Sequence, residues 1–140
     1  MVKIEIIHSK FKSINETLEI LRPYQKLSLQ DFLRNKDSQF TVQYALLTAI
    51  QALLDVGNHI LADRNIRNVA DYRDIIVKLG QEKIMPPSFI ESISDMAGFR
   101  NRLIHEYQDV DPQKVYGFLK ERLGDFEEFM RLVRDHFRLS

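Results

Sequence analysis

The stretch from Phe40 to about Ala62 constrains the fold most, because on a helical wheel it is apolar on almost every side. A helix of this kind has to be covered by other elements, so it is expected at the centre of a bundle. Small residues along it would let neighbouring helices approach closely. Three polar residues near its end are interpreted either as satisfied core groups or as part of a site: Asp55, Asn58 and His59.

The rest of the chain also reads as helices. An apolar seam with alternating spacings of three and four predicts an amphipathic helix from Ile4 to Leu21, ending before Pro23. Shorter helices are predicted over 28–33 and 72–80, a longer one over 86–107, and a last one from Asp111-Pro112 to Phe137. We therefore expect a single all-α domain over 1–140, an up-and-down bundle of four to five helices.

Composition narrows the function classes. Twenty basic and twenty acidic residues cancel, so any RNA contact must come from a local basic face or the face of an oligomer. There is no cysteine, and hence no disulfide or thiolate metal site. The histidines lack the spacing of a metal site, and no glycine-rich phosphate loop occurs, so neither a metal nor a cofactor is expected. With no signal peptide and no apolar run judged long enough to span a bilayer, we expect a cytoplasmic protein without membrane partners.

The segment Gly98 to Tyr107 carries the candidate chemistry. On the predicted helix Arg100 falls within an apolar arc, where a guanidinium would need an anionic partner. The arc consists of Ile90, Ile93, Met96, Ala97, Leu103, Ile104 and Tyr107. His105 lies about 140° away from Arg100, beside Asn101 and Gly98. One helix therefore cannot easily bring Arg100 and His105 onto one small group, and a second helix or a second copy of the chain would help. We expect a homodimer that pairs two motif helices across a two-fold axis, with the site in the cleft between them.

The pattern Arg-x4-His-x-Tyr, with asparagine after the arginine, resembles the signature of the HepT-like toxins of the HEPN superfamily. Here it reads Arg100, Asn101, His105 and Tyr107. Three further segments resemble the family in the same order along the chain. They are the run at 46–59, Tyr72-Arg-Asp-Ile and Asp109-Val-Asp-Pro.

The resemblance implies a metal-independent endoribonuclease toxin that acts on RNA and not DNA. The imidazole of His105 would take the proton from the attacking 2′-hydroxyl, and Arg100 would stabilise charge on the phosphate. Asn101 would orient the ring or bind phosphate. The resemblance further implies that Tyr107 is adenylylated by a minimal nucleotidyltransferase (MntA-like) antitoxin, which would block phosphate entry by bulk and charge.

Each of these residues also has a structural interpretation. Arg100 would form a core salt bridge and His105 would be a surface histidine. Tyr107 would be a core residue with its hydroxyl at the rim. Arg102 would form a surface ion pair with Glu106, or else contact an RNA backbone. The cluster Arg64, Arg67 and Arg73 is interpreted as a solvated turn in preference to a docking patch.

Two other functions remain open at this point. HEPN domains also serve as non-catalytic modules that bind a nucleotide or act as a scaffold for a partner nucleotidyltransferase. A plain helical assembly subunit would be favoured if Arg100 were fully buried on a core acid such as Asp55.

Overall fold

The structure is a computed structural model that describes residues 2–139. These residues form eight α-helices and one 3-10 helix, with no strand among them, which confirms the all-α bundle. The elements in order are α1 (Ile4–Leu21), η1 (Arg22–Lys26), α2 (Leu29–Arg34), α3 (Lys36–Asp63), α4 (Tyr72–Gln81), α5 (Pro87–Ile93), α6 (Met96–His105), α7 (Pro112–Glu121) and α8 (Leu123–Phe137).

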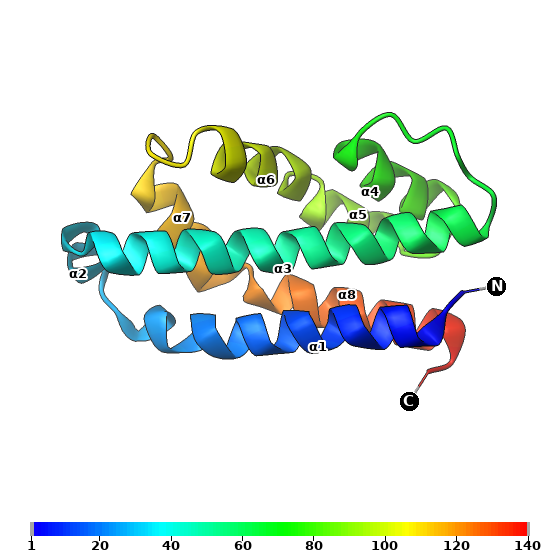
Figure 1. Ribbon diagram of the computed structural model, residues 1–140, viewed down its shortest axis with the longest axis horizontal. Helices are drawn as coiled ribbons and strands as arrows, with labels where there is room; N and C mark the ends of the chain where they lie inside the picture. The colour runs from blue at the N-terminus through cyan, green and yellow to red at the C-terminus, as the bar shows by residue number, and fades with distance from the viewer. Residues whose placement is uncertain (1, 140) are drawn as a thin grey trace.

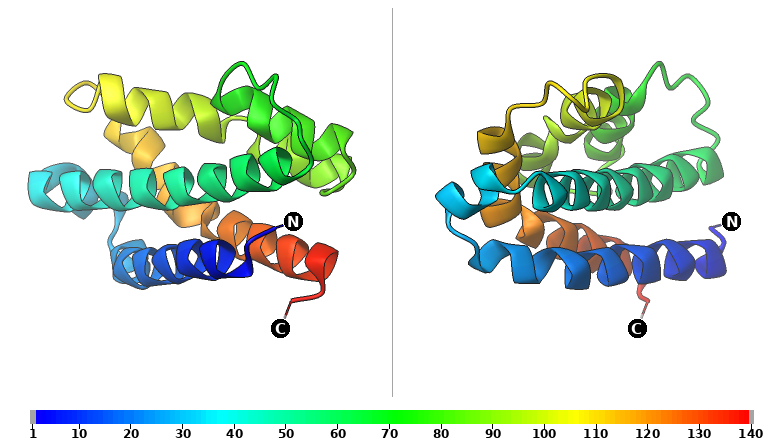
Figure 2. Two further views of the ribbon diagram at one scale, coloured as in Figure 1. Left: turned by 45° about the vertical axis from the view of Figure 1, so that its right-hand side comes forward. Right: turned by 60° about the vertical axis from the view of Figure 1, so that its left-hand side comes forward.

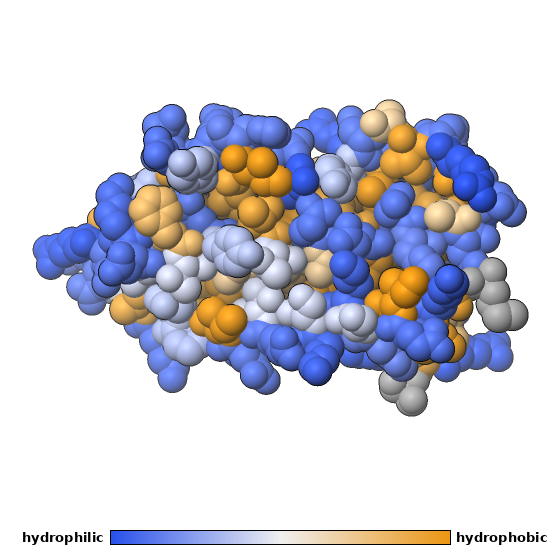
Figure 3. All heavy atoms as spheres, viewed as in Figure 1, coloured by the Kyte–Doolittle hydropathy of each residue, from blue (hydrophilic) through white to orange (hydrophobic). Residues whose placement is uncertain are grey.

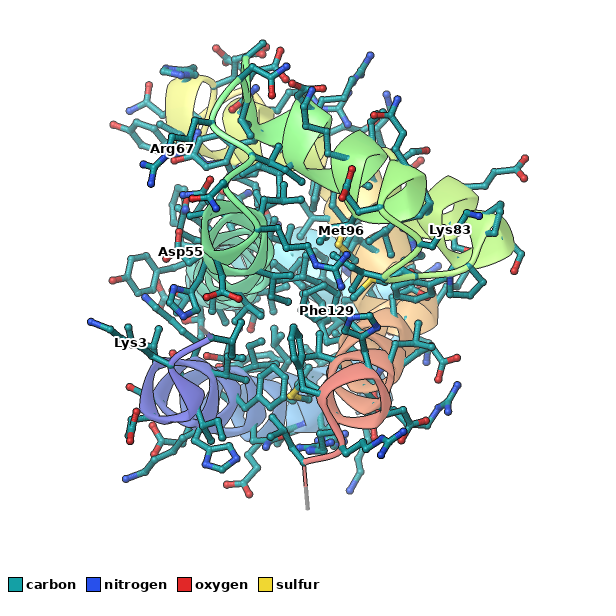
Figure 4. The ribbon with its side chains drawn as sticks, turned by 90° about the vertical axis from the view of Figure 1, so that its right-hand side faces the viewer. Lys3, Asp55, Arg67, Lys83, Met96 and Phe129 are labelled. Atoms are coloured by element: carbon teal, nitrogen blue, oxygen red, sulfur yellow. The ribbon has the colours of Figure 1, made fainter. Side chains whose placement is uncertain are left out.

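Helix α3 is the central element, as its composition predicts. It lies between α1 on one side and α4 to α6 on the other, and it also contacts α2, α7 and α8 (Figure 1). The end-on view of Figure 4 places Met96 and Phe129 in the filled interior, while Lys3, Arg67 and Lys83 point outward. At Gly57 an added Cβ would come within 2.8 Å of the Ile75 side chain, so α3 and α4 approach as closely as a glycine allows.

One expectation about α3 needs correction. By length and composition this helix is sufficient to cross a membrane, with a mean hydropathy of 1.4 over 18 residues. Within the bundle, however, 61% of that window is buried. The apolar residues that give the helix its hydropathy are those that pack against the surrounding helices.

Local capping signals place several helices where the sequence predicts them. The first helix ends at Leu21, one residue before the 3-10 turn that contains Pro23. Ser28 Oγ accepts the amide N–H of Asp31 at 3.1 Å, and this caps α2. The carboxylate of Asp111 likewise accepts an amide N–H at 2.9 Å at the start of α7.

Two predicted long helices are each interrupted. The helix expected over 86–107 is α5 and α6, with a break at Ser94 and Asp95, and the helix expected over 112–137 is α7 and α8, with a break at Arg122. The two breaks are tied together, because Arg122 donates to both carboxylate oxygens of Asp95 at 2.9 Å and to the Ser92 carbonyl at 2.7 Å. Arg122 also bonds Asp125 at 2.7 Å. Figure 2 shows α7 passing behind α3 and α8 continuing from it as a separate helix below α3, on the side of α1.

Replacing Arg122 with methionine should therefore loosen the link between the two breaks. The Arg122→Met variant loses the paired bonds to Asp95 and leaves a carbonyl without its donor. We expect the free energy of unfolding to fall by about 1–2 kcal/mol, measured by urea denaturation. Arg131→Met is the matched control, because Arg131 bonds only Glu128 and Asp135 of its own helix on the surface and should leave the urea midpoint unchanged.

The same pair predicts a pH dependence. Hydrogen bonds from Arg122 lower the pKa of Asp95 below its usual 3.8. A lowered carboxyl pKa stabilises the fold above the unfolded-state pKa and stops doing so as the pH falls through the folded-state pKa. The stability difference between the wild type and Arg122→Met should thus be full at pH 7 and shrink below about pH 4. A difference that stays constant down to pH 2 would contradict this assignment.

Candidate functional site

Helix α6 is oriented by four buried residues that face the bundle: Met96, Ala97, Phe99 and Leu103. Phe99 stacks on Phe118 of α7, with ring centroids 4.7 Å apart. The predicted apolar arc is right for Met96, Ala97 and Leu103. It is wrong at the far end, because Ile104 is 36% exposed and Tyr107 lies beyond the end of the helix.

Arg100 lies half-buried where α6 meets α3 and α4. Its Nε donates to Oε1 of Gln51 at 2.8 Å, and its Nη1 donates to Oδ1 of Asn101 at 2.9 Å. The guanidinium carbon stands 4.1 Å from the ring centroid of Tyr72, a cation–π contact. The expected anionic partner is therefore replaced by a neutral amide and an aromatic face.

Asp55 is reached only through Gln51. Gln51 Nε2 donates to Asp55 Oδ1 at 2.9 Å, and Lys10 Nζ bonds the other oxygen of that carboxylate at 3.1 Å. The condition that would favour a plain assembly subunit, Arg100 fully buried directly on Asp55, is not met.

His105 is the last residue of α6 and is exposed. In the described part of the chain its ring makes no hydrogen bond, and Asn101 bonds Arg100 in place of it. Arg100 and His105 lie in one unbroken helix, so they keep their separation of about 140° around its axis. A single chain brings Arg100 and Asn101 together and leaves His105 apart from them.

Tyr107 is accessible, which corrects its interpretation as a core residue. It is 53% exposed, and its hydroxyl accepts a hydrogen bond from Gln108 Nε2 at 3.3 Å. Arg102 is exposed, with its guanidinium 5.7 Å from the Phe99 ring centroid. The expected ion pair of Arg102 with Glu106 is not formed between these two described residues, because α6 ends at His105 and Glu106 has left the helical conformation.

Three site residues escape the sequence reasoning. Gln51 is a polar residue inside the apolar run at 46–59. Tyr72 begins the segment Tyr72-Arg-Asp-Ile, for which the sequence predicts no role in the site. Arg73 was assigned to a solvated turn, yet its Nη2 lies 4.0 Å from where a Cβ of Gly98 would be. Gly98 shares a face of α6 with Asn101 and His105, so Arg73 adds a cation beside that face. Arg64 points elsewhere and bonds His136 at 2.8 Å.

Among residues 2–139 no group of three or more histidine, aspartate or glutamate side chains gathers in a way that could hold a metal ion.

A hydrophobic groove runs beside the motif, between α3 and α6, and we call it the α3–α6 groove. It encloses about 420 Å³, and Figure 3 shows hydrophobic side chains gathered over these two helices. A second hollow of about 300 Å³ continues it towards Gln51. On the groove lining Gln43 is only 7% exposed, and its Oε1 has no hydrogen-bond partner. The lining residues are Phe40, Gln43, Tyr44, Leu47, Leu103, Ile104 and Tyr107.

Comparison with known proteins gives the family. A tRNA nuclease HepT of Aphanizomenon flos-aquae (strain 2012/KM1/D3) is 28% identical over 138 residues, which cover 97% of this chain and 94% of that protein. An mRNA nuclease HepT of Shewanella oneidensis is 26% identical over 99 residues, 68% of this chain and 74% of that one.

The fold has solved counterparts as well. The structure of a tri-AMPylated Shewanella oneidensis HEPN toxin in complex with MNT antitoxin superposes with a TM-score of 0.83 at 23% identity, covering 93% of this chain and 97% of the toxin. The family described as Ribonuclease HepT-like matches residues 14–133. The chain therefore belongs to the ribonuclease HepT-like family.

Proposed function

We propose that this ribonuclease is the toxin of a toxin–antitoxin pair, and that it cleaves RNA as a homodimer without a metal ion or cofactor. The family assigns the reaction class, and its HepT relatives are named as nucleases of tRNA and of mRNA. The observation that supports the residue roles best is Arg100, a charged group held in place by neutral partners.

Arg100 is prepared to bind a phosphate. Two of its nitrogens are engaged by Gln51 and Asn101, and its Nη2 makes no hydrogen bond to any described residue. A guanidinium fixed this way needs little reorganisation to donate to a phosphate oxygen, so it stabilises the charge that develops during cleavage. Asn101 holds Arg100 and binds phosphate only through it.

His105 is suited to the proton transfers. The exposed imidazole of His105 can be reached by a substrate, and it takes the proton of a 2′-hydroxyl as that oxygen attacks the adjacent phosphorus. The bond between phosphorus and the 5′-oxygen then breaks, the 5′-oxygen takes a proton from the protonated imidazole, and a 2′,3′-cyclic phosphate remains on the upstream fragment. Arg73 and Arg102 supply local positive charge for the RNA backbone, which the balanced overall charge does not.

The α3–α6 groove supports a homodimer. Three large hydrophobic side chains are exposed along the proposed contact, at 47% for Phe40, 72% for Tyr44 and 36% for Ile104, while Tyr107 at the end of the groove stays outside that contact. The face offers both a projecting ring, Tyr44, and the hollow beside it, which is what a self-complementary two-fold contact needs. Gln43 Oε1 on the groove lining has no hydrogen-bond partner among the described residues, and a contact that supplied a donor there would remove the cost of an unpaired buried oxygen. Because Ile104 adjoins His105 in sequence, pairing here sets motif helices of two copies near each other.

The partner we propose is a nucleotidyltransferase antitoxin that adenylylates Tyr107. The toxin of the Shewanella complex is described as tri-AMPylated and bound to its MNT antitoxin. In this chain the Tyr107 phenol is exposed, two residues after His105, so an added AMP would place its negative charge close to the cleavage groups. Because its proposed partners are RNA and a nucleotidyltransferase, we propose that the protein acts in the cytoplasm.

Removing the imidazole should stop cleavage. His105→Ala should lower the cleavage rate by at least about 100-fold, as expected for loss of a general base, while far-UV circular dichroism and the thermal midpoint stay unchanged. The assay uses unmodified protein, checked by intact mass, with tRNA and mRNA and with EDTA present, and it reads product ends for 2′,3′-cyclic phosphate. His8→Ala, another exposed histidine, should cleave like the wild type. Unmodified wild type that binds RNA or nucleotide without cleaving would favour the non-catalytic binding module.

Removing the phenol oxygen should separate activity from control. Tyr107→Phe should cleave RNA at the wild-type rate and gain no AMP mass from the cognate nucleotidyltransferase and ATP. Tyr44→Phe is the matched control, because Tyr44 is the more exposed tyrosine of the same groove and its loss should leave modification intact. Continued AMP addition to Tyr107→Phe would refute the assignment.

A charge in the groove should separate the two copies. Ile104→Asp places a carboxylate on the proposed contact and should convert the dimer to a monomer in sedimentation equilibrium, with loss of cleavage and retention of helicity. Ile20→Asp on α1 is the matched control, since Ile20 is a 52% exposed isoleucine outside the groove. A dimer that survives Ile104→Asp would place the contact on another face.

A further inference from the structure

We infer that Gln51 is a positioning residue for Arg100, and that Lys10, Asp55 and Gln51 form a relay that orients the guanidinium without cancelling its charge. The inference rests on the proposed role of Arg100 in cleavage and extends it to residues of two other helices. None of the three residues belongs to the Arg-x4-His-x-Tyr motif.

The relay is a continuous chain of short polar contacts across three helices. Lys10 of α1 bonds Asp55 Oδ2 at 3.1 Å, and Asp55 Oδ1 accepts from Gln51 Nε2 at 2.9 Å. Gln51 Oε1 then accepts from Arg100 Nε at 2.8 Å. Asp55 and Gln51 are one turn apart on α3, so the helix backbone fixes their spacing.

The charges at the two ends fix the direction of the amide. An ionised carboxylate only accepts hydrogen bonds, so Gln51 must present its amino group to Asp55. Its carbonyl oxygen is thereby left facing Arg100, which only donates. A glutamine between an acid and an arginine has one amide orientation that satisfies both neighbours. In that orientation the Gln51 oxygen accepts the hydrogen bond from Arg100 Nε.

A neutral residue at position 51 preserves the cationic character of Arg100. A carboxylate there would hold the same Nε–H bond, but it would form an ion pair that competes with a phosphate and would be repelled by Asp55. Lys10 balances the charge of Asp55 at the far end of the relay. The Tyr72 ring holds the flat face of the guanidinium, so the group is confined on two sides while Nη2 stays available.

The first test replaces Gln51 with leucine, which keeps similar bulk and removes the acceptor. Gln51→Leu should lower kcat by about 10- to 100-fold, as expected when a catalytic group is slightly misplaced, and change KM by less than about threefold. Gln51→Glu should also lose activity although it retains an acceptor. Asp55→Asn should lower kcat, because the side-chain amide of Gln51 can then flip and present its amino group to Arg100. Asp37→Asn, at an exposed acid of the same helix, should cleave like the wild type.

Coupling separates positioning from general destabilisation. If Gln51 acts through Arg100, then adding Gln51→Leu to Arg100→Ala should cause no further loss of kcat. Losses that multiply in the double variant would overturn the relay, and so would full activity in Gln51→Leu while Arg100→Ala is impaired.

A second readout does not depend on cleavage. In ¹⁵N NMR spectra the Arg100 Nε–H should give a resolved, slowly exchanging signal in the wild type that broadens or exchanges with water in Gln51→Leu. An unchanged signal would overturn the relay whatever the activity. Wild-type protein with the protected signal but no RNA cleavage would instead overturn the proposed function and with it the catalytic purpose of the relay.

Discussion

The charge on Arg100 is the constraint around which the site is built. A guanidinium stays protonated at every pH at which the protein folds, so half-burying it between helices requires compensation. An acidic partner would compensate the charge, but it would also form an ion pair that competes with a phosphate. The chain uses the carbonyl of Gln51, the ring of Tyr72 and the amide of Asn101, which together hold the group, leave Nη2 available and leave its positive charge in place.

These three partners come from different helices, so the packing of α3, α4 and α6 determines where the charge lies. Gly57 lets α4 approach α3 closely, and this proximity lets Tyr72 reach the guanidinium from the start of α4. Arg122 bonds Asp95 at the break between α5 and α6, so the rotation of α6 about its own axis is set independently of α5. With this rotation of α6, Phe99 is buried and Ile104 faces outward into the α3–α6 groove.

The sequence predicts well what local rules determine. The helix from Ile4 to Leu21, the central helix and the start at Asp111-Pro112 follow from spacing and capping, which involve near neighbours. The breaks at Asp95 and Arg122 are not visible locally, because the apolar spacing continues through them. They depend on a salt bridge between residues 27 positions apart.

The same distinction holds for the site. Arg100, His105 and Tyr107 are identified by their spacing in a motif, whereas Gln51 bonds Arg100 across 49 residues of sequence. Nothing in the spacing within α3 marks which polar residue faces α6. The exposure of Tyr107 is equally invisible, because a helical wheel drawn through to Tyr107 places it on the buried arc, while the helix in fact stops at His105.

In the proposed function, cleavage, association and control all depend on residues at the end of α6. His105 closes the helix, Ile104 before it faces the groove proposed for the second copy, and Tyr107 lies in the turn that follows. An anion added to Tyr107 would thus meet the cationic groups of the site. Because the total charge of the chain is zero, this local balance alone decides whether a phosphate is attracted. Under the proposed function, a negatively charged group at Tyr107 would therefore oppose RNA binding by its charge.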